Sequence, residues 1–170
     1  MAGTELFDDR AVQASLSKLG GQLSVSLARS MGVAGGKIMR DTAKALAPEY
    51  DGSTGLAGGK NVDIPPVPGL LKSAIYLAFK ERLSDSGHVT YGISWNSKIA
   101  PHGHLLEFGH WRLNKIVNGI PTNIPLKTPK WVPAHPFLRP AYNVALVPAR
   151  AAMFERGRER LPELLREAKA

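Results

Sequence analysis

The chain has 170 residues, of which 44% are hydrophobic and 21% are charged, and its formal net charge is +8. This length suits one domain with a real core, and the composition excludes wholesale disorder. Cysteine is absent, which excludes disulfides and thiolate metal sites and makes assembly in a cytoplasm the default expectation.

The first residues include acidic side chains where a signal peptide needs a basic start, and no stretch approaches 18 apolar residues. We therefore expect neither secretion by this route nor a membrane-spanning helix. The positive charge favours an acidic partner, such as nucleic acid or an anionic protein face. Most of the excess lies between Lys98 and Arg139, where six Lys or Arg residues accompany one acid, Glu107.

Residues 8–47 are predicted to be helical, because apolar side chains recur there at spacings of three and four. They are Val12, Leu16, Leu19, Leu23, Leu27, Met31, Ala34 and Ile38. Pro48 cannot continue the helix. The glycines at 20–21 and 32–36 each cost about 1 kcal/mol relative to alanine, which predicts a kink or a break into two helices. Alternatively, these small residues let a neighbouring helix approach closely.

Residues 49–69 lack periodicity and are rich in Gly, Pro, Asp and Ser, which predicts a loop. Within it, GSTGLAGGK is similar to a phosphate-binding loop, but Asn61 follows Lys60 where that motif requires Ser or Thr. Nucleotide binding is therefore not expected.

Residues 70–96 are predicted to form an antiparallel strand hairpin. A first strand is expected from about Ser73, with a helix as the alternative, and 88–96 alternates more cleanly. The turn composition at 85–87 joins the two strands. Together with the flanking helices this predicts an α+β fold, in which a long kinked or broken N-terminal helix and a C-terminal helix pack on a small antiparallel sheet.

The stretch 102–108 is predicted to be a short helix that Gly109 stops. Residues 111–133 follow as a basic, proline-rich extended arm, in which frequent prolines forbid both a helix and a central strand. An edge hairpin that turns at Asn118 and Gly119 is the alternative. Residues 141–168 are predicted to form a C-terminal helix in spite of Pro148 and Pro162, with Glu and Arg pairs along it.

Few residues of the chain are candidates for metal binding or catalysis. His102, His104, Glu107 and His110 are ligand types for zinc, but their spacing does not place them on one helix face, so no metal site is expected. Glu107 lies between Leu106 and Phe108, which predicts a partly buried carboxylate with Arg139 as its partner. No nucleophile elbow or pair of catalytic acids is present, so we expect no enzyme and no cofactor.

Several short motifs together resemble a known family. They are LAP at 46–48, GLLKSAI at 69–75, VTYGI at 89–93, EFG at 107–109 and AHPFLRPA at 134–141. The chain resembles the tail-completion or head–tail joining proteins of long-tailed phages, the gene-product-ten-like family of lambdoid phages, whose wider group includes Z-type minor tail proteins. The resemblance covers roughly residues 35 to 155. The chain departs from it at His110 and Trp111, where the family has a small residue or threonine, and in its long arm.

The resemblance implies a non-enzymatic virion protein, assembled in the host cytoplasm, that forms a ring at the head-proximal end of the tail. Its partners would be further copies of itself, as a hexamer or alternatively a dodecamer, and neighbouring neck proteins: a head-completion or connector ring, a tail terminator or the tail tube. DNA in the lumen is a further candidate partner, and a membrane is not. The alternative from another class is a DNA-binding or architectural protein that uses the basic arm.

Three groups of residues are expected to carry these roles. The ring interface is assigned to Trp111, Trp131 and Phe137, because buried aromatics commonly dominate interface energetics. The EFG motif at 107–109 and the AHPFLRPA motif at 134–141, which we call the two signatures, are expected to fix the subunit core. Their residues with this role are Glu107, Phe108, Gly109, His135, Pro136, Arg139 and Pro140. Contacts to DNA or to an acidic protein are assigned to Arg112, Lys115, Lys127 and Lys130.

Overall fold

A computed structural model describes residues 9–49, 68–85, 88–117 and 120–167, with backbone alone for 9–19, 120 and 121. The chain has the expected α+β fold. Its described elements are α1 (Asp9–Leu46), α2 (Leu70–Ala74), β1 (Ile75–Phe79), the 3-10 helix η1 (Glu81–Leu83), β2 (Tyr91–Trp95), α3 (Gly103–Phe108), β3 (His110–Val117), β4 (Ile120–Val132) and α4 (Leu138–Glu167). Most of the predicted loop 49–69 lies outside the described residues, as does the glycine-rich stretch within it.

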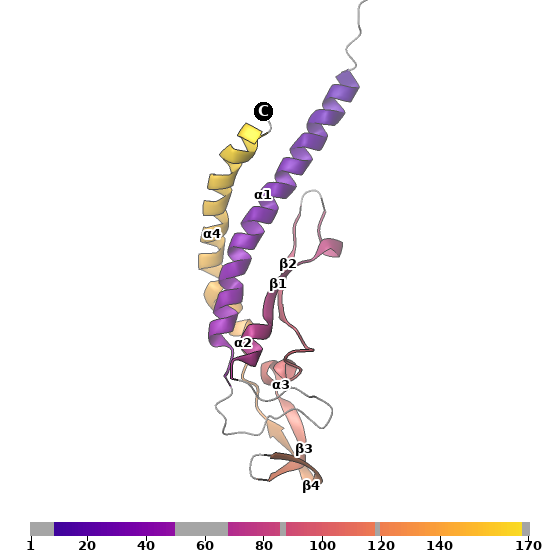
Figure 1. The fold of residues 1–170 in the computed structure, drawn as a ribbon, viewed down its shortest axis with the longest axis vertical. Helices are drawn as coiled ribbons and strands as arrows, with labels where there is room; N and C mark the ends of the chain where they lie inside the picture. The colour runs from indigo at the N-terminus through magenta and orange to yellow at the C-terminus, as the bar shows by residue number, and fades with distance from the viewer. Residues whose placement is uncertain (1–8, 50–67, 86–87, 118–119, 168–170) are drawn as a thin grey trace, which may run out of the picture.

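Helix α1 is continuous through both groups of glycines, so the predicted break was wrong (Figure 1). The alternative, close approach of a neighbouring element, describes the glycines at 32–36, whereas nothing lies within 4 Å of a Cβ added at Gly20 or Gly21. A Cβ on Gly35 would lie 2.6 Å from Met153 Cγ and 3.0 Å from the Ala149 carbonyl oxygen. On the neighbouring face, Gly36 lies against Leu77 in the same way. The glycines therefore admit α4 and β1 at close range, and this packing offsets their helix penalty.

Helices α1 and α4 run antiparallel along most of their length (Figure 1). Arg156 Nε donates a hydrogen bond to Ser30 Oγ at 3.0 Å, and Gly157 lies against Met31. The buried residues of α4 include the alanines at 141, 145 and 149, and the Ala149 carbonyl oxygen lies against Gly35 of α1. Small residues on both helices thus allow close contact but bury little apolar area per residue.

Strands β1 and β2 form the predicted antiparallel hairpin, in which Ile75 pairs with Trp95 and Phe79 with Tyr91. The first strand begins two residues later than predicted, because α2 precedes it. The hairpin packs on the side of α1 opposite α4, so α1 is the central layer (Figure 1). The C-terminal helix was expected to pack on the sheet, but α4 packs on α1.

Helix α3 occupies the predicted short helix, and Gly109 ends it with φ of 73°. Strands β3 and β4 then form a second two-stranded antiparallel sheet, which projects from the end of the helical layer (Figure 1). The edge-hairpin alternative for the arm is therefore confirmed, although its turn residues 118–119 lie outside the described residues. Both strands of a two-stranded sheet have a free edge, which is why β4 tolerates Pro121, Pro125 and Pro129.

Helix α4 starts at Leu138, three residues before the predicted start. Pro140 lies in the first turn, where a backbone N–H has no intrahelical partner to lose, so the helix can include it. The helix continues through Pro148 and Pro162, and both are exposed.

The core of the described chain is small and rich in alanine. Its buried hydrophobic residues are Ala43, Ala47, Leu71, Ala74, Ile75, Ala100, Phe137, Ala141, Ala145, Ala149 and Leu164. Larger apolar side chains such as Trp111, Val147 and Phe154 remain more than half exposed. The described part of the chain therefore leaves many large apolar side chains in water.

Candidate interaction surface

The two signatures predicted from the sequence meet at the junction between α3 and α4. The Glu107 carboxylate is buried, and its Oε2 accepts hydrogen bonds from the N–H groups of Phe137 at 2.8 Å and Leu138 at 3.0 Å. Its Oε1 accepts the Arg139 N–H at 3.3 Å. These are the first N–H groups of α4, which no residue within the helix can satisfy. Glu107 thus caps α4 from another helix, at the end that favours negative charge.

Burial alone would raise the pKa of Glu107, but the hydrogen bonds from Leu138, Phe137 and Arg139 outweigh it and hold the pKa below its ordinary value. The carboxylate is therefore charged in the folded protein at neutral pH. A charged group this deeply buried needs such donors to remain in place.

Arg139 closes the same junction from the solvent side, so the predicted pairing with Glu107 is confirmed. Its Nε lies 3.3 Å from Glu107 Oε1, and its Nη2 donates to the Glu107 carbonyl oxygen at 3.0 Å. Its guanidinium carbon lies 5.3 Å from the centroid of the Phe108 ring. Because 65% of the Arg139 side chain is exposed, solvent screens this pair, and the three backbone donors carry more of the cap.

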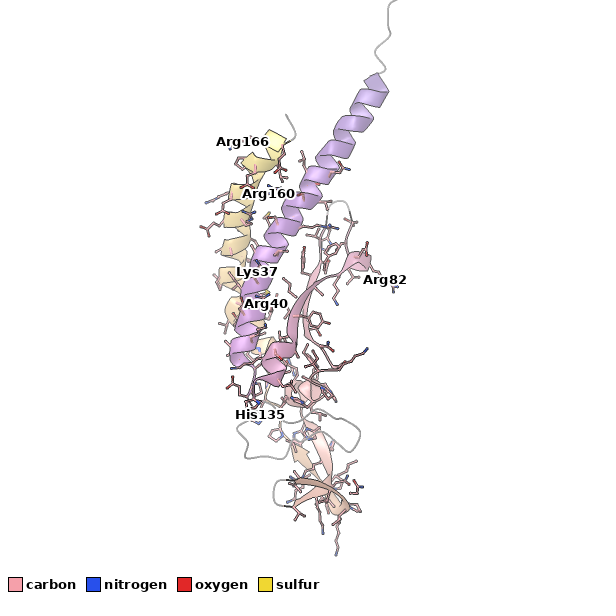
Figure 2. All side chains as sticks on the ribbon, viewed as in Figure 1. Lys37, Arg40, Arg82, His135, Arg160 and Arg166 are labelled. Carbon is pink, nitrogen blue, oxygen red and sulfur yellow. The ribbon has the colours of Figure 1, made fainter. Side chains whose placement is uncertain are left out.

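The remaining signature residues orient the arm and do not build the core. The His135 N–H donates to the Leu106 carbonyl oxygen at 2.7 Å, and His135 lies where the helices meet the arm (Figure 2). A side chain at Gly109 would meet Trp131 and the Val132 carbonyl oxygen, both at 2.8 Å. The expectation that all these positions fix the core was wrong in part, because Phe108, His135, Pro136 and Arg139 are exposed and Pro140 is half-buried.

The aromatic residues assigned to an interface separate into two environments. Trp111 and Trp131 are direct cross-strand partners on the β3–β4 hairpin, with ring centroids 5.3 Å apart and exposed fractions of 61% and 50%. Phe137 is fully buried and packs edge-on against Trp95 at 5.9 Å. Phe137 is therefore a core residue and cannot anchor a neighbouring subunit, whereas the tryptophan pair is free to do so.

The basic residues assigned to an acidic partner lie on the same hairpin. Arg112 and Lys130 are direct cross-strand partners, on the face opposite the tryptophan pair because side chains alternate along a strand. Lys115 and Lys127 are exposed. Like charges opposite one another repel, and the segment 110–132 contains no acid to neutralise them. The arm thus combines the exposed Trp111–Trp131 pair on one face with Arg112 and Lys130 on the other.

The histidines that were weighed as metal ligands have other surroundings. Burial, and secondarily the neighbouring His104, lower the pKa of His102, which favours its neutral form. Glu107 already accepts the α4 donors. In the ranges that the structure describes, no group of three or more His, Asp or Glu side chains is arranged to hold a metal ion.

Sequence reasoning missed the helix-capping role of Glu107. The sequence held one clue to this role. The first turn of α4 has no acidic residue and no Ser, Thr, Asp or Asn cap of its own, so its N–H groups need an acceptor from elsewhere in the chain. None of the described helices is long and apolar enough to span a membrane. Comparisons with family models, curated proteins and solved structures returned no match for this chain.

Proposed function

We propose that this chain is a structural virion protein that forms a ring in the neck, at the head-proximal end of a long phage tail, and joins tail to head. The observation that carries the proposal is the exposed Trp111–Trp131 pair on an arm that projects from an alanine-rich subunit. Exposed paired aromatics of this kind are frequent anchors of protein interfaces. The kind of assembly, a ring in a phage neck, is inferred from the resemblance to head–tail joining proteins. That resemblance rests on the motifs at 46–48, 69–75, 89–93, 107–109 and 134–141.

A ring requires a heterologous contact, in which one surface of a subunit meets a different surface of the next. The β3–β4 hairpin suits this role, because it reaches away from the α1–α4 pair (Figure 1) and its two tryptophans are exposed. We expect a hexamer on the tail side of the neck, with a dodecamer on the connector side as the alternative. The chain acts without catalysis or cofactor, and it is assembled into particles in the host cytoplasm.

The arm can be tested by removing it. Residues 114–129 are replaced by a short glycine-containing turn, which is compatible with the fold because Arg112 and Lys130 are already paired across the strands. The purified variant is expected to remain folded but to lose ring formation, and it should fail to restore infectious particles to a phage that lacks this gene. Full restoration by the shortened chain would reject the arm as the assembly contact.

A matched pair of variants separates the tryptophans from the arm as a whole. Trp131→Ala removes one member of the pair, whereas Thr128→Ala changes an exposed residue of the same strand to which no contact is assigned. We expect the first variant to impair ring formation and the second to leave it intact. Electron-microscopy class averages of the assembled neck would give the copy number.

A second candidate function, binding of DNA by the arm, is favoured by the opposed Arg112 and Lys130 and by the absence of acid between residues 110 and 132. Phosphate contacts of this type release counterions, so the affinity for duplex DNA should fall as salt is raised. Titration of a duplex at several salt concentrations tests it. Binding that is absent or independent of salt would exclude the candidate, and Arg112→Ala should reduce the salt slope by about one if the contact is made.

A further inference from the structure

A second exposed surface lies on α4, on the side away from α1. Seven positions are separated alternately by three and four residues, and every one of them is exposed. We call them the α4 stripe: Val144, Val147, Ala151, Phe154, Arg158, Leu161 and Leu165. Val147 is 76% exposed and Phe154 is 66% exposed. The alanines at 141, 145 and 149 are buried, so the two sides of α4 are distinct.

The alternating spacing of the α4 stripe has a specific geometric meaning. Apolar residues that repeat every 3.5 residues on average form a seam that stays in contact with another helix when the two helices cross at a shallow angle. Scattered exposed apolar residues are ordinary on a protein surface, but a continuous row marks an interaction site. The stripe therefore has the pattern of a helix that pairs with a second helix.

One charged residue interrupts the stripe and indicates what covers it. Arg158 forms no ion pair within the described part of the chain, and Glu155 beside the stripe forms none there either. The neighbouring Arg156 and Arg160 are both paired with glutamates of the same helix. An unpaired cation and an unpaired anion three residues apart would complement each other across a contact between two copies of α4.

We propose that a second copy of this chain covers the α4 stripe, with the two α4 helices antiparallel about a twofold axis. A parallel arrangement would place Arg158 opposite Arg158 of the partner subunit, so two like charges would meet in an apolar seam. The antiparallel arrangement in which Phe154 faces Arg158 of the partner subunit avoids this repulsion. It places each guanidinium on an aromatic ring and beside Glu155 of the partner subunit, where both contacts are attractive.

The same register matches the sizes of the apolar residues. Ala151 lies opposite Leu161 of the partner subunit, and Val147 lies opposite Leu165 of the partner subunit, so a small residue meets a larger one in each layer. The paired segment runs from 147 to 165, which is about 28 Å of helix. This twofold contact goes beyond the proposed ring, since the stripe is a different surface from the tryptophan pair.

The absence of cysteine from the chain allows a direct test of the register by cross-linking. Ala151→Cys and Leu161→Cys are prepared separately and oxidised alone and as an equimolar mixture. The antiparallel register brings the two positions together only between unlike variants, so a disulfide-linked dimer should form in the mixture and not in either variant alone. Cross-linking of each variant with itself, or no cross-linking at all, would overturn the proposal.

Charge exchange provides a second test by sedimentation of the purified chain. Arg158→Glu and Glu155→Arg should each weaken self-association about tenfold, because like charges then face each other. Mixing the two variants should restore it, since each charged position then meets its opposite. Tyr142→Glu, an exposed residue of α4 outside the stripe, is the matched control and should have no effect.

Circular dichroism verifies that each variant is folded. A wild-type chain that is monomeric at all concentrations would contradict the inference. So would charge variants that associate as strongly as the wild type. These assays need no phage component, so their outcome does not depend on the proposed ring function.

Discussion

The carboxylate of Glu107 and the backbone N–H of Phe137 lie 2.8 Å apart, although thirty positions separate them in the sequence. Between them the chain forms the whole β3–β4 hairpin. One buried charge thus closes the base of the arm and starts helix α4, so that the direction of the arm and the position of α4 depend on the same contact.

Replacing Glu107 should destabilise the subunit more than replacing its partner Arg139. Glu107→Ala leaves the first N–H groups of α4 without an acceptor, and we expect a loss of about 2 to 4 kcal/mol in the free energy of unfolding. Arg139→Ala should cost less than about 1 kcal/mol, because most of that side chain is in water. Urea unfolding of the two variants measures both. Equal losses would mean that the ion pair, and not the helix cap, stabilises the junction.

The same junction makes stability depend on pH in a defined direction. The folded pKa of Glu107 lies below the unfolded value of about 4.3, so the folded state binds the proton less readily than the unfolded state does. The contribution of Glu107 is therefore complete above about pH 4.3 and declines as the pH falls below it. Glu107→Gln lacks this titration. The stability difference between wild type and Glu107→Gln should narrow in acid and stay constant between pH 6 and 8, which urea unfolding at several pH values would show.

Local signals predicted the parts of the fold that depend on neighbouring residues in the chain. Alternation identified the strand around Tyr91 to Trp95, and the position of Gly109 identified the end of α3, because a positive φ is needed there. For the arm, the sequence pair Asn118 and Gly119 indicated a hairpin only as the alternative to an extended segment.

Contacts between distant segments were harder to predict. The start of α4 was placed too late because the acceptor for its N–H groups is Glu107, far upstream. Phe137 was assigned to an interface because aromatic residues commonly dominate interface energetics, whereas tertiary packing against Trp95 buries it within the chain itself. The pairing of Glu107 with Arg139 could be predicted, since a carboxylate between apolar residues requires a donor.

The two groups of glycines in α1 should respond oppositely to alanine. At Gly20 nothing lies within 4 Å of an added Cβ, so Gly20→Ala should stabilise the chain by about 0.5 to 1 kcal/mol through helix propensity. At Gly35 the added Cβ meets Met153 and the Ala149 backbone, so α1 and α4 must separate and the change should cost about 1 to 3 kcal/mol. Thermal unfolding of both variants tests this. A stabilised Gly35→Ala would show that the helices are not in close contact at this position.

Replacing one tryptophan of the Trp111–Trp131 pair should affect ring formation far more than the free energy of unfolding. Trp111 and Trp131 pack edge to face but remain half or more exposed, so Trp131→Ala should cost only about 0.5 to 1.5 kcal/mol in the stability of the chain. If the pair anchors a neighbouring copy, the same change should abolish ring formation, because a buried aromatic anchor contributes at least about 2 kcal/mol to an interface. Urea unfolding measures the first effect and sedimentation of the assembled protein the second.

Phe137→Ala is the informative contrast: it removes a fully buried ring and should cost about 3 to 5 kcal/mol in the free energy of unfolding. A Trp131→Ala variant that assembles normally would remove the aromatic pair from the interface and leave the basic face of the arm as the surface to test.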